Sequence, residues 1–383
     1  MTRTLEDEFE SATENAALVE LLRQRIDAEG VITFHDYMET VLYHPQHGYY
    51  TTREPMGRQG DYLTSPEVDP IFGSLVAKQL QQLWELMDRP ARFDVVEQGA
   101  GSGLLARDIL RRTRRRAPDF ADALSYRIVD VSSSLKRRQA ETLAEYEVEW
   151  SDDLPQKIDG CLLSNELLDS FPVHRVVHRD GQLMEVMVTH ENGRFEEVTG
   201  PPTAKIAEYF ADLGFWPGDG CVVEVNLQAV DWMASAAQAL QRGLVLTFDF
   251  GYPAKELYAP WRRDGTLLCF YRHNPSSDPY ARVGKQDMTA HVDFTTLMRT
   301  GESHGLETTG FTTQSRFLAA LGIGAGVDSV AKESPEALEE YYNRRRAVQV
   351  LIDAAGLGRI RVLAQSRGLA APALIGFVDQ TDG

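Results

Sequence analysis

Three glycines at alternate positions, Gly99, Gly101 and Gly103, separate a short apolar run from a sequence with helical spacing. The run FDVVE at 93–97 predicts a buried strand, and LLARDILRRTRRR at 104–116 predicts a helix. Glycine lets the backbone turn sharply and lets a ligand approach where a Cβ would block it. This strand–loop–helix unit therefore indicates an α/β fold. For the loop alone, a tight turn without a ligand stays open as the alternative.

The segments that follow continue the alternation of apolar strands and helices. YRIVDV at 126–131, GCLLSNE at 160–166 and LVLTFDFGY at 244–252 are mostly apolar, which is typical of strands covered on both faces. A shorter strand is expected at YEVEW, 146–150, and two late ones at GLETTGFTT and RIRVLAQ. The pattern predicts a Rossmann-like α/β fold with a mostly parallel sheet between two layers of helices.

One region between these strands follows a different pattern. VHRVVHRDGQLMEVMVTHENGRFEEV predicts three antiparallel strands that turn at Asp180-Gly181 and at Asn192-Gly193. A helix and a strand–helix pair follow before the buried-strand pattern returns. We therefore expect residues 171–242 to form an inserted α+β subdomain.

The remaining residues divide into a core and an N-terminal part. We expect residues 91–170 and 243–383 to form the α/β core, and residues 1–90 to be a helical region. The N-terminal region carries a long polar loop, TTREPMGRQGDYLTSPE at 51–67, whose length suggests a function.

The charge of the chain disfavours one class of partner. Its 57 acidic and 39 basic residues give a formal net charge of −18. Such a surface repels phosphate backbones, so nucleic-acid binding is not expected. An adaptation for solubility or salt explains the charge equally well.

The cysteines and the apolar runs of the sequence indicate a cellular compartment. Three cysteines, Cys161, Cys221 and Cys269, lie far apart without a CxxC motif, which argues against a disulfide framework or a zinc knuckle. No run approaches the roughly 20 apolar residues of a membrane span, and no secretory signal is visible. We therefore expect a cytoplasmic chain with no membrane association.

The acids around the glycine loop indicate the kind of ligand. The loop lacks the G-x-G-x-x-G pattern of dinucleotide sites and the G-K-[ST] of a P-loop. Glu97, two residues before the first glycine, suits a ligand with an ammonium group, and Asp130 is placed for ribose hydroxyls. Asp152 could accept from an adenine amino group, with a helix cap or turn as the alternative. This order describes S-adenosylmethionine better than a nicotinamide dinucleotide.

A second group of polar residues follows the strand at 160–166. Ligands bind beyond the carboxyl ends of strands in open parallel sheets, so this loop should face the reactive end of the cofactor. Asn165 could hold the methionine part or an incoming nucleophile. Glu166 and Asp169 could bind a guanidinium and orient its nitrogen. The alternative is a turn whose acids cap the next helix.

The histidines do not indicate a metal. His44 and His47, and His174 and His178, have spacings found in metal sites, but no third ligand is evident nearby. Surface or packing roles are the expectation for these four. His291, in TAHVDF, is a better candidate for a polar role near the pocket.

Several longer segments together carry a family resemblance. From about Thr33 to Gly368 the chain resembles the MidA-like family of S-adenosylmethionine-dependent methyltransferases, which includes mitochondrial assembly factors of respiratory complex I. The resemblance is carried by YHPQHGYYTT, GDYLTSPEV, the glycine loop, YRIVDVS, SNELLDSFPVHR, FDFGY, GTLLCFYRHNPSSDPY and DMTAHVDF. Of these, GDYLTSPE and NELLDSFPVHR are far more specific than a glycine loop.

The resemblance implies a fold and a set of site residues. The fold is a seven-stranded methyltransferase sheet with an N-terminal helical cap and an inserted subdomain. The residues that match the family's cofactor and acceptor motifs are Gly99, Gly101, Gly103, Asp130, Asn165, Glu166 and Asp169, with Thr64 and Ser65 in the cap loop. The chain departs from the family at Leu167 and Leu168, where larger aromatic residues are more common, and at Ala100, where many members have proline.

Together these observations predict an S-adenosylmethionine-dependent methyltransferase that acts on a protein arginine side chain. Eukaryotic members of the family are associated with an arginine of a complex I subunit, so a respiratory-complex subunit is a candidate partner, and a homodimer is possible. A small-molecule O- or N-methyltransferase is one alternative. A non-catalytic assembly factor on the same fold is the other.

Overall fold

The computed structural model describes residues 14–52, 61, 63–328 and 335–378. The chain divides into two units, and each unit is built from three separate segments. Unit 1 comprises Met1–Tyr62, Leu168–Trp232 and Gly251–Leu297; unit 2 comprises Leu63–Leu167, Met233–Phe250 and Met298–Gly383. Each unit has hydrophobic core clusters of its own.

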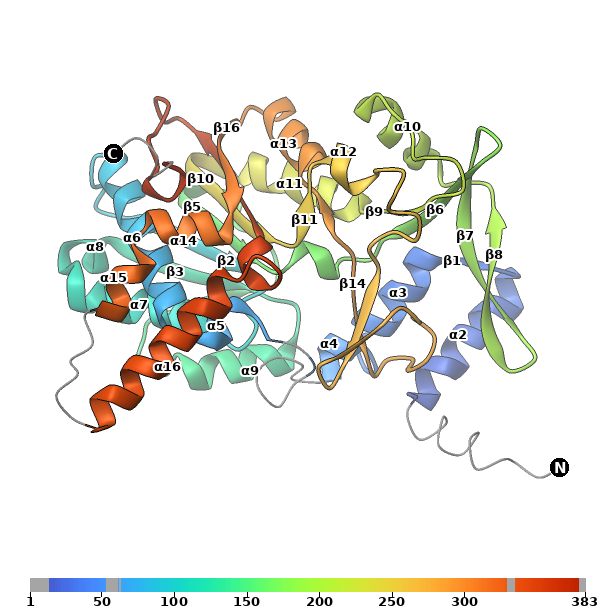
Figure 1. Ribbon diagram of the computed structural model, residues 1–383, viewed down its shortest axis with the longest axis horizontal. Helices are drawn as coiled ribbons and strands as arrows, with labels where there is room; N and C mark the ends of the chain where they lie inside the picture. The colour runs from blue at the N-terminus through green and yellow to red at the C-terminus, as the bar shows by residue number, and fades with distance from the viewer. Residues whose placement is uncertain (1–13, 53–60, 62, 329–334, 379–383) are drawn as a thin grey trace. The chain divides into compact units, whose positions relative to one another are not determined.

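Unit 2 is built on a seven-stranded sheet with the order β16-β17-β10-β5-β2-β3-β4 (Figure 1). Its strands are β2 (Phe93–Gln98), β3 (Leu124–Val129), β4 (Glu149–Ser151), β5 (Ile158–Asn165), β10 (Leu240–Asp249), β16 (Glu307–Thr313) and β17 (Arg361–Arg367). The five strands β4, β3, β2, β5 and β10 are parallel. β17 lies antiparallel between β10 and β16. This confirms the expected α/β fold with seven strands, and it corrects the strand expected at 146–150 to Glu149–Ser151.

The order of the strands predicts which edge of the sheet binds a ligand. The chain runs outward from β2 through β3 to β4 and then returns to the other side of β2 as β5. At such a reversal the connections leave in opposite directions, which opens a crevice beyond the carboxyl ends of the two central strands. The glycine loop follows β2 and the segment from Glu166 follows β5, so both lie at this edge.

Unit 2 also contains eight α-helices among the described residues. They are α5 (Ser65–Val68), α6 (Ile71–Leu86), α7 (Leu104–Arg116), α8 (Pro118–Ala123), α9 (Ser133–Thr142), α14 (Gln314–Ala320), α15 (Ile323–Asp328) and α16 (Pro335–Ile352). In α6, buried Phe72, Val76, Leu80 and Leu83 recur at three- and four-residue spacing, which makes one apolar stripe. α6 packs beside α7.

Unit 1 contains a second, mostly antiparallel sheet. Its path is β1 (Ile32–Thr33), β7 (Gln182–Glu191), β6 (His174–Arg179) and β9 (Val222–Val225), and β8 (Arg194–Gly200) pairs with β7. The turns fall at Asp180-Gly181 and Asn192-Gly193, where all four residues have positive φ, as two-residue hairpin loops require. The three predicted antiparallel strands are therefore confirmed.

The other elements of unit 1 are short. Its helices are α2 (Ala16–Glu29), α3 (Phe34–Tyr43), α4 (Tyr49–Thr52), α10 (Ala204–Leu213) and α12 (Ala254–Leu257). Its short strands are β11 (Gly251–Tyr252) with β15 (Val292–Asp293), and β13 (Asn274–Ser276), β12 (Leu268–Tyr271) and β14 (Asp287–Thr289). Two helices, α11 (Leu227–Ala239) and α13 (Phe294–Ser303), contain residues of both units.

The division differs from the boundaries expected from the sequence in two long segments and in two short ones, 168–170, which belong to unit 1, and 233–242, which belong to unit 2. Residues 251–297 belong to unit 1, although we expected them in the core; their strands have two to four residues and show no periodicity. Residues 63–90 belong to unit 2, because the apolar stripe of α6 is part of that unit's core.

Candidate functional site

The glycine loop has the backbone that its sequence predicts. Gly99, Gly101 and Gly103 have φ values of 72°, 54° and 79°, in the left-handed region that favours glycine. A Cβ on Gly99 would come within 2.8 Å of Leu167 Cδ1. Gly103 is the N-cap of α7 and makes no side-chain cap hydrogen bond. The left-handed backbone and the close packing of Leu167 therefore account for glycine in this loop, which leads directly into α7.

Asp130, the expected ribose acid, is almost fully buried beside this loop. Its Oδ1 accepts a hydrogen bond from the backbone N–H of Ser132 at 2.9 Å, and its Oδ2 accepts from Gln139 Nε2 at 2.7 Å. Burial raises the pKa of this carboxyl, and both hydrogen bonds oppose the shift. Asp130 therefore has a fixed orientation, with lone pairs left for a ligand.

Glu97, the expected ammonium acceptor, lies at the end of β2. The hydroxyl of Tyr126 donates to its Oε2 at 2.6 Å. Burial raises the pKa of Glu97 to about 7, opposed by the hydrogen bond from Tyr126 and reinforced by the charge of Asp130. A buried carboxylate in this state would be stabilised by a cationic ligand group.

Asn165 ends the neighbouring strand β5, and Glu166 follows it directly. Asn165 Nδ2 donates to Glu166 Oε1 at 3.1 Å, whereas Asn165 Oδ1 is buried and has no hydrogen-bond partner among the described residues. Glu166 has a φ of 51°, which is uncommon for a residue other than glycine. Burial raises the pKa of Glu166 to about 7. An orphaned acceptor and a carboxylate of raised pKa thus lie at the carboxyl end of β5, where the strand order predicts a ligand-binding edge.

The TSPE segment (64–67) forms hydrogen bonds with both the loop after β5 and the glycine loop, all within unit 2. The backbone N–H of Ser65 donates to Glu166 Oε1 at 3.0 Å, and its Oγ donates to Gln314 Oε1 at 2.9 Å. Ser102, in the glycine loop, donates to Glu67 Oε1 at 2.6 Å. Thr64 is buried and makes no side-chain cap hydrogen bond at α5. Residues 53–60 and 62 of the expected cap loop lie outside the described residues.

Three further residues proposed from the sequence make no hydrogen bond to this set that the described residues show. Asp152, the expected adenine acid, is largely exposed and forms an ion pair with Lys136. Asp169 and His291 belong to unit 1, since the chain passes from unit 2 to unit 1 between Leu167 and Leu168. The backbone carbonyl of Asp169 accepts from Ala290 at 2.8 Å. The structure therefore describes Glu166 and Asp169 in different units.

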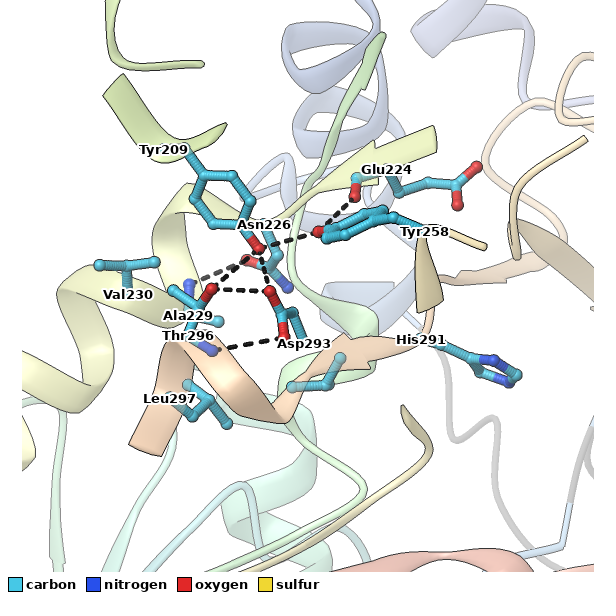
Figure 2. A pocket seen from close by; sticks show the side chains of 11 residues that line it. Tyr209, Glu224, Asn226, Ala229, Val230, Tyr258, His291, Asp293, Thr296 and Leu297 are labelled. Carbon is cyan, nitrogen blue, oxygen red and sulfur yellow. Dashed lines mark hydrogen bonds between the residues drawn. The ribbon is translucent and has the colours of Figure 1, made fainter. Parts of the chain in front are cut away.

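His291 lines a small pocket of unit 1 (Figure 2). The polar centre of this pocket is Asp293, whose Oδ2 accepts from the Tyr209 hydroxyl at 2.7 Å and from Thr296 Oγ1 at 2.6 Å. The Tyr209 and Tyr258 hydroxyls lie 2.8 Å apart. Figure 2 shows these groups pointing toward one another, with the His291 ring outside their network. The network stabilises the pocket wall.

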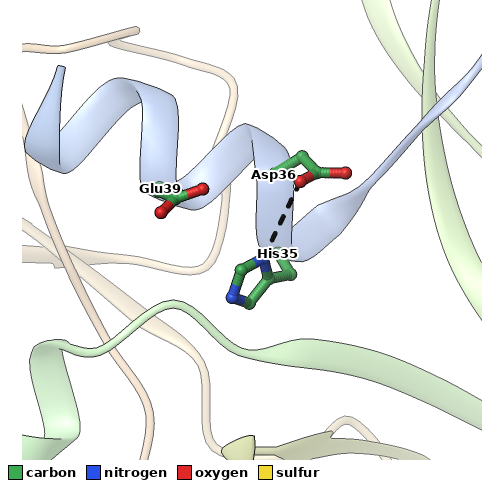
Figure 3. A group of neighbouring side chains, drawn as sticks. All are labelled: His35, Asp36 and Glu39. Carbon is green, nitrogen blue, oxygen red and sulfur yellow. Dashed lines mark ion pairs between the residues drawn. The ribbon is translucent and has the colours of Figure 1, made fainter. Parts of the chain in front are cut away.

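One histidine and two acids lie close enough together to suggest a cation site (Figure 3). His35, Asp36 and Glu39 all project from the first turns of α3. Asp36 and Thr33 form a capping pair: Thr33 Oγ1 accepts from the Asp36 N–H at 3.0 Å and donates to Asp36 Oδ2 at 2.8 Å. Helix capping accounts for the position of Asp36, and we assign no metal to the group.

Sequence reasoning missed three residues of the unit 2 site. Gln139 bonds to Asp130, Gln314 accepts from Ser65, and Asp249 Oδ2 accepts from the Leu167 N–H at 3.2 Å. All three side chains are buried. Asp249 could have been found, since it ends a buried strand in FDFGY. The two glutamines lie in helices among polar neighbours, and nothing in the sequence distinguishes them from surface residues.

The residues present fit S-adenosyl-L-methionine. The loop with three positive-φ glycines leads into the N-terminus of α7, Asp130 retains acceptor positions for hydroxyls, and the orphaned Oδ1 of Asn165 can accept from an ammonium group. Residues 75–312 match the model of a family described as S-adenosyl-L-methionine-dependent methyltransferases. The match spans more than half of the chain. The chain therefore belongs to this family, and it is an S-adenosyl-L-methionine-dependent methyltransferase.

Curated relatives and a solved structure agree with this assignment. The chain is 28% identical over 394 residues to "Protein arginine methyltransferase NDUFAF7 homolog, mitochondrial" of Drosophila melanogaster, covering 93% of this chain and 86% of the relative. It is 28% identical over 352 residues to the Homo sapiens protein arginine methyltransferase NDUFAF7, covering 82% and 75%. A candidate methyl transferase from Burkholderia thailandensis, solved with bound S-adenosyl-homocysteine, has 33% identity and a TM-score of 0.87, covering 99% of this chain and 97% of that one.

These relatives correct one expectation. Both curated relatives are named mitochondrial, which contradicts the cytoplasmic location expected from the sequence. That expectation rested on unpaired cysteines, and the three cysteines are indeed free and buried. Free cysteines distinguish a reducing from an oxidising compartment but cannot distinguish one reducing compartment from another. In the described part of the chain, no helix has both the length and the apolar character to cross a membrane.

Proposed function

We propose that this methyltransferase transfers the methyl group to the side chain of an arginine in a protein substrate. The relatives described above are named protein arginine methyltransferases, and this supports a guanidinium acceptor. The observation in this chain that carries the proposal is Glu166, a half-buried carboxylate directly after β5 whose pKa is raised to about 7 by desolvation. No ion pair involving Glu166 occurs among the described residues, so its charge is available to a cationic substrate.

The cofactor would be held by residues of unit 2. Gly99, Gly101 and Gly103 would receive the nucleoside backbone, Asp130 the ribose hydroxyls, and Glu97 with Asn165 the methionine ammonium group. Thr64 and Ser65 were expected to donate to the methionine carboxylate. Both donors of Ser65 bind protein groups here, so Thr64 is the better candidate. Asp152 is proposed near the adenine, where binding would have to displace Lys136.

The bound cofactor supplies an electrophilic methyl group on a sulfonium. The protein must then present an unprotonated nitrogen in line with that methyl and exclude water. Glu166 would hold the planar guanidinium through one or two N–H groups and partly neutralise its charge. Asp169 is proposed as the second carboxylate of this acceptor site and His291 as a polar residue near it. The N-terminal residues and the inserted subdomain are proposed to cap the site.

The substrate is proposed to be basic and a subunit of a respiratory complex. A net charge of −18 favours encounter with a positively charged partner through long-range attraction. The link to a respiratory complex rests on the family resemblance. The homodimer stays a prediction that no described residue tests.

Two alternatives stay open, and two experiments test the proposal against them. A narrow, apolar pocket around Leu167 and Leu168 would favour a small-molecule O- or N-methyltransferase over an enzyme with an open groove for a peptide. A non-catalytic assembly factor would keep the fold without transfer. Mass spectrometry of methylated peptides, in cells with and without this chain, should reveal an arginine whose methylation depends on it. Labelled cofactor incubated with purified chain and a mitochondrial protein extract should label the same peptide. Cofactor binding without any dependent methylarginine would reject the proposal.

A further inference from the structure

We infer that Gln139 is the positioning residue that sets the ribose acid Asp130 against the glycine loop. This inference rests on the proposed role of Asp130. Gln139 lies in α9 and is fully buried. Its Nε2 donates to Asp130 Oδ2 at 2.7 Å and to the Gly101 carbonyl at 3.0 Å, so one amide group links the acid and the loop.

The orientation of this amide is determined by its third partner. Trp150 Nε1 donates to Gln139 Oε1 at 3.1 Å. An indole N–H can only donate, so the amide oxygen must face Trp150 and the NH₂ group must face Asp130 and Gly101. Both amide protons are then used. If the amide were reversed, its oxygen would face the Asp130 carboxylate, and two acceptors would lie within hydrogen-bond distance of each other.

The backbone of the loop is held against the same residue. A Cβ on Gly103 would lie 3.3 Å from Gln139 Cα, so the glycine loop packs closely on α9 at this point. Gln139 therefore sets the distance between two elements that a nucleoside must bridge. Ser132 N–H on Oδ1 and Gln139 on Oδ2 hold the Asp130 carboxylate by both of its oxygens, and a carboxylate held in this way can still accept from ribose hydroxyls.

The test compares S-adenosyl-L-homocysteine with its 2′,3′-dideoxy analogue by calorimetry. In the wild-type chain, loss of the two hydroxyls should weaken binding about tenfold to a hundredfold, because hydrogen bonds to a charged group are lost. Gln139→Met keeps a similar volume and removes the amide. We expect it to bind the two ligands within about threefold of each other, since Asp130 would no longer be held in place.

Control variants separate positioning from general stability. Gln79 is another fully buried glutamine of unit 2; its Oε1 accepts from the Gly376 N–H. Gln79→Met should lower the melting temperature and keep the wild-type discrimination between the ligands. Trp150→Phe keeps an aromatic ring but frees the Gln139 amide to rotate. The ratio of its affinities for the two ligands should lie between those of the wild type and Gln139→Met. If Gln139→Met does not fold, the ratio measured for Trp150→Phe tests the inference in its place.

The outcomes are distinguishable. Wild-type discrimination retained in a folded Gln139→Met, or in Trp150→Phe when the first variant does not fold, overturns the inference while leaving the cofactor site intact. A wild-type chain that binds both ligands equally overturns it together with the ribose role of Asp130. A wild-type chain that does not bind S-adenosyl-L-homocysteine rejects the proposed cofactor site itself.

Discussion

The backbone N–H of Ser65 donates to Oε1 of Glu166 at 3.0 Å, across 101 residues of chain. The same oxygen accepts from Asn165 Nδ2. The carboxylate proposed to bind the acceptor is therefore also a structural link between the TSPE segment and the end of β5. A substitution at Glu166 tests both roles, and they predict different results.

Glu166→Gln should lower methyl transfer on the order of a hundredfold or more while leaving cofactor affinity near that of the wild type. A neutral amide can still accept from Ser65 but cannot neutralise a guanidinium. Asp169→Asn is the companion variant and should act in the same direction. Transfer to a candidate peptide, cofactor titration and thermal melts are the measurements. Parallel losses of stability and affinity would favour the structural role, and full activity in both variants would end the catalytic proposal.

The same variant should change how stability depends on pH. Burial raises the pKa of Glu166 to about 7, above its ordinary value of 4.5. A carboxyl shifted upward in the folded state contributes stability below about pH 4.5, and this contribution is lost as the pH rises through about 7. Glu166→Gln should therefore be more stable relative to the wild type at pH 8 than at pH 5. Urea unfolding at the two pH values checks this, and a constant difference would contradict it.

Cofactor affinity should rise with pH because of Glu97. Burial raises the pKa of Glu97 to about 7, so at pH 5 to 6 binding to an ammonium group must first release a proton. Affinity should increase by up to about tenfold per pH unit below pH 7 and level off above it. Glu97→Gln should bind more weakly and without this slope. Glu166→Gln should keep the slope, which assigns the titration to Glu97. Calorimetry from pH 5 to pH 8 is the measurement.

Gly101→Val should abolish cofactor binding with only a modest loss of stability. Gly101 has a φ of 54°, and holding a branched side chain there costs about 1–3 kcal/mol. The matched control is Gly181→Val, at a hairpin turn of unit 1 with a φ of 75° and open space around the added Cβ. It carries similar backbone strain and should bind the cofactor normally. Unchanged affinity in a folded Gly101→Val would remove the glycine loop from the site.

The cap loop should resist proteolysis when cofactor is bound. Glu67 accepts from Ser102 in the glycine loop at 2.6 Å, so the TSPE segment is attached to the proposed cofactor site. Cleavage within residues 51–67 should slow on addition of S-adenosyl-L-homocysteine, and Ser102→Ala should reduce this protection. Equal cleavage rates with and without ligand would count against closure of the loop.

The apolar strands made much of unit 2 predictable. β2, β3, β5 and β10 are mostly apolar runs, which are typical of strands in a sheet covered on both faces, and the α/β class was inferred from them. The hairpins were predictable for a different reason, because Asp-Gly and Asn-Gly tolerate positive φ. Each of these predictions depended on local sequence alone.

The hydrogen-bond partners of the site residues could not be predicted, because they lie far away in the sequence. Gln314 meets Ser65 across 249 residues, and no local pattern predicts such a contact. Gln139 lies in SSLKRRQAETLAEY, where the polar neighbours made it look like a surface residue. The roles of Glu166 and Asp169 were proposed because they are three residues apart. The chain passes from unit 2 to unit 1 between them, so this spacing does not predict how the two carboxylates are oriented.

The position of β17 has a consequence for biosynthesis. β17 is the strand that comes latest in the sequence of the seven, yet it lies inside the sheet between β10 and β16. A growing chain therefore carries β10 with an unpaired edge until residues 361–367 leave the ribosome, and an unpaired edge invites pairing with other chains. A chain truncated before Arg361 would keep every proposed cofactor residue. It would lack β17, so β10 would have no partner on that side and β16 would not be joined to the sheet.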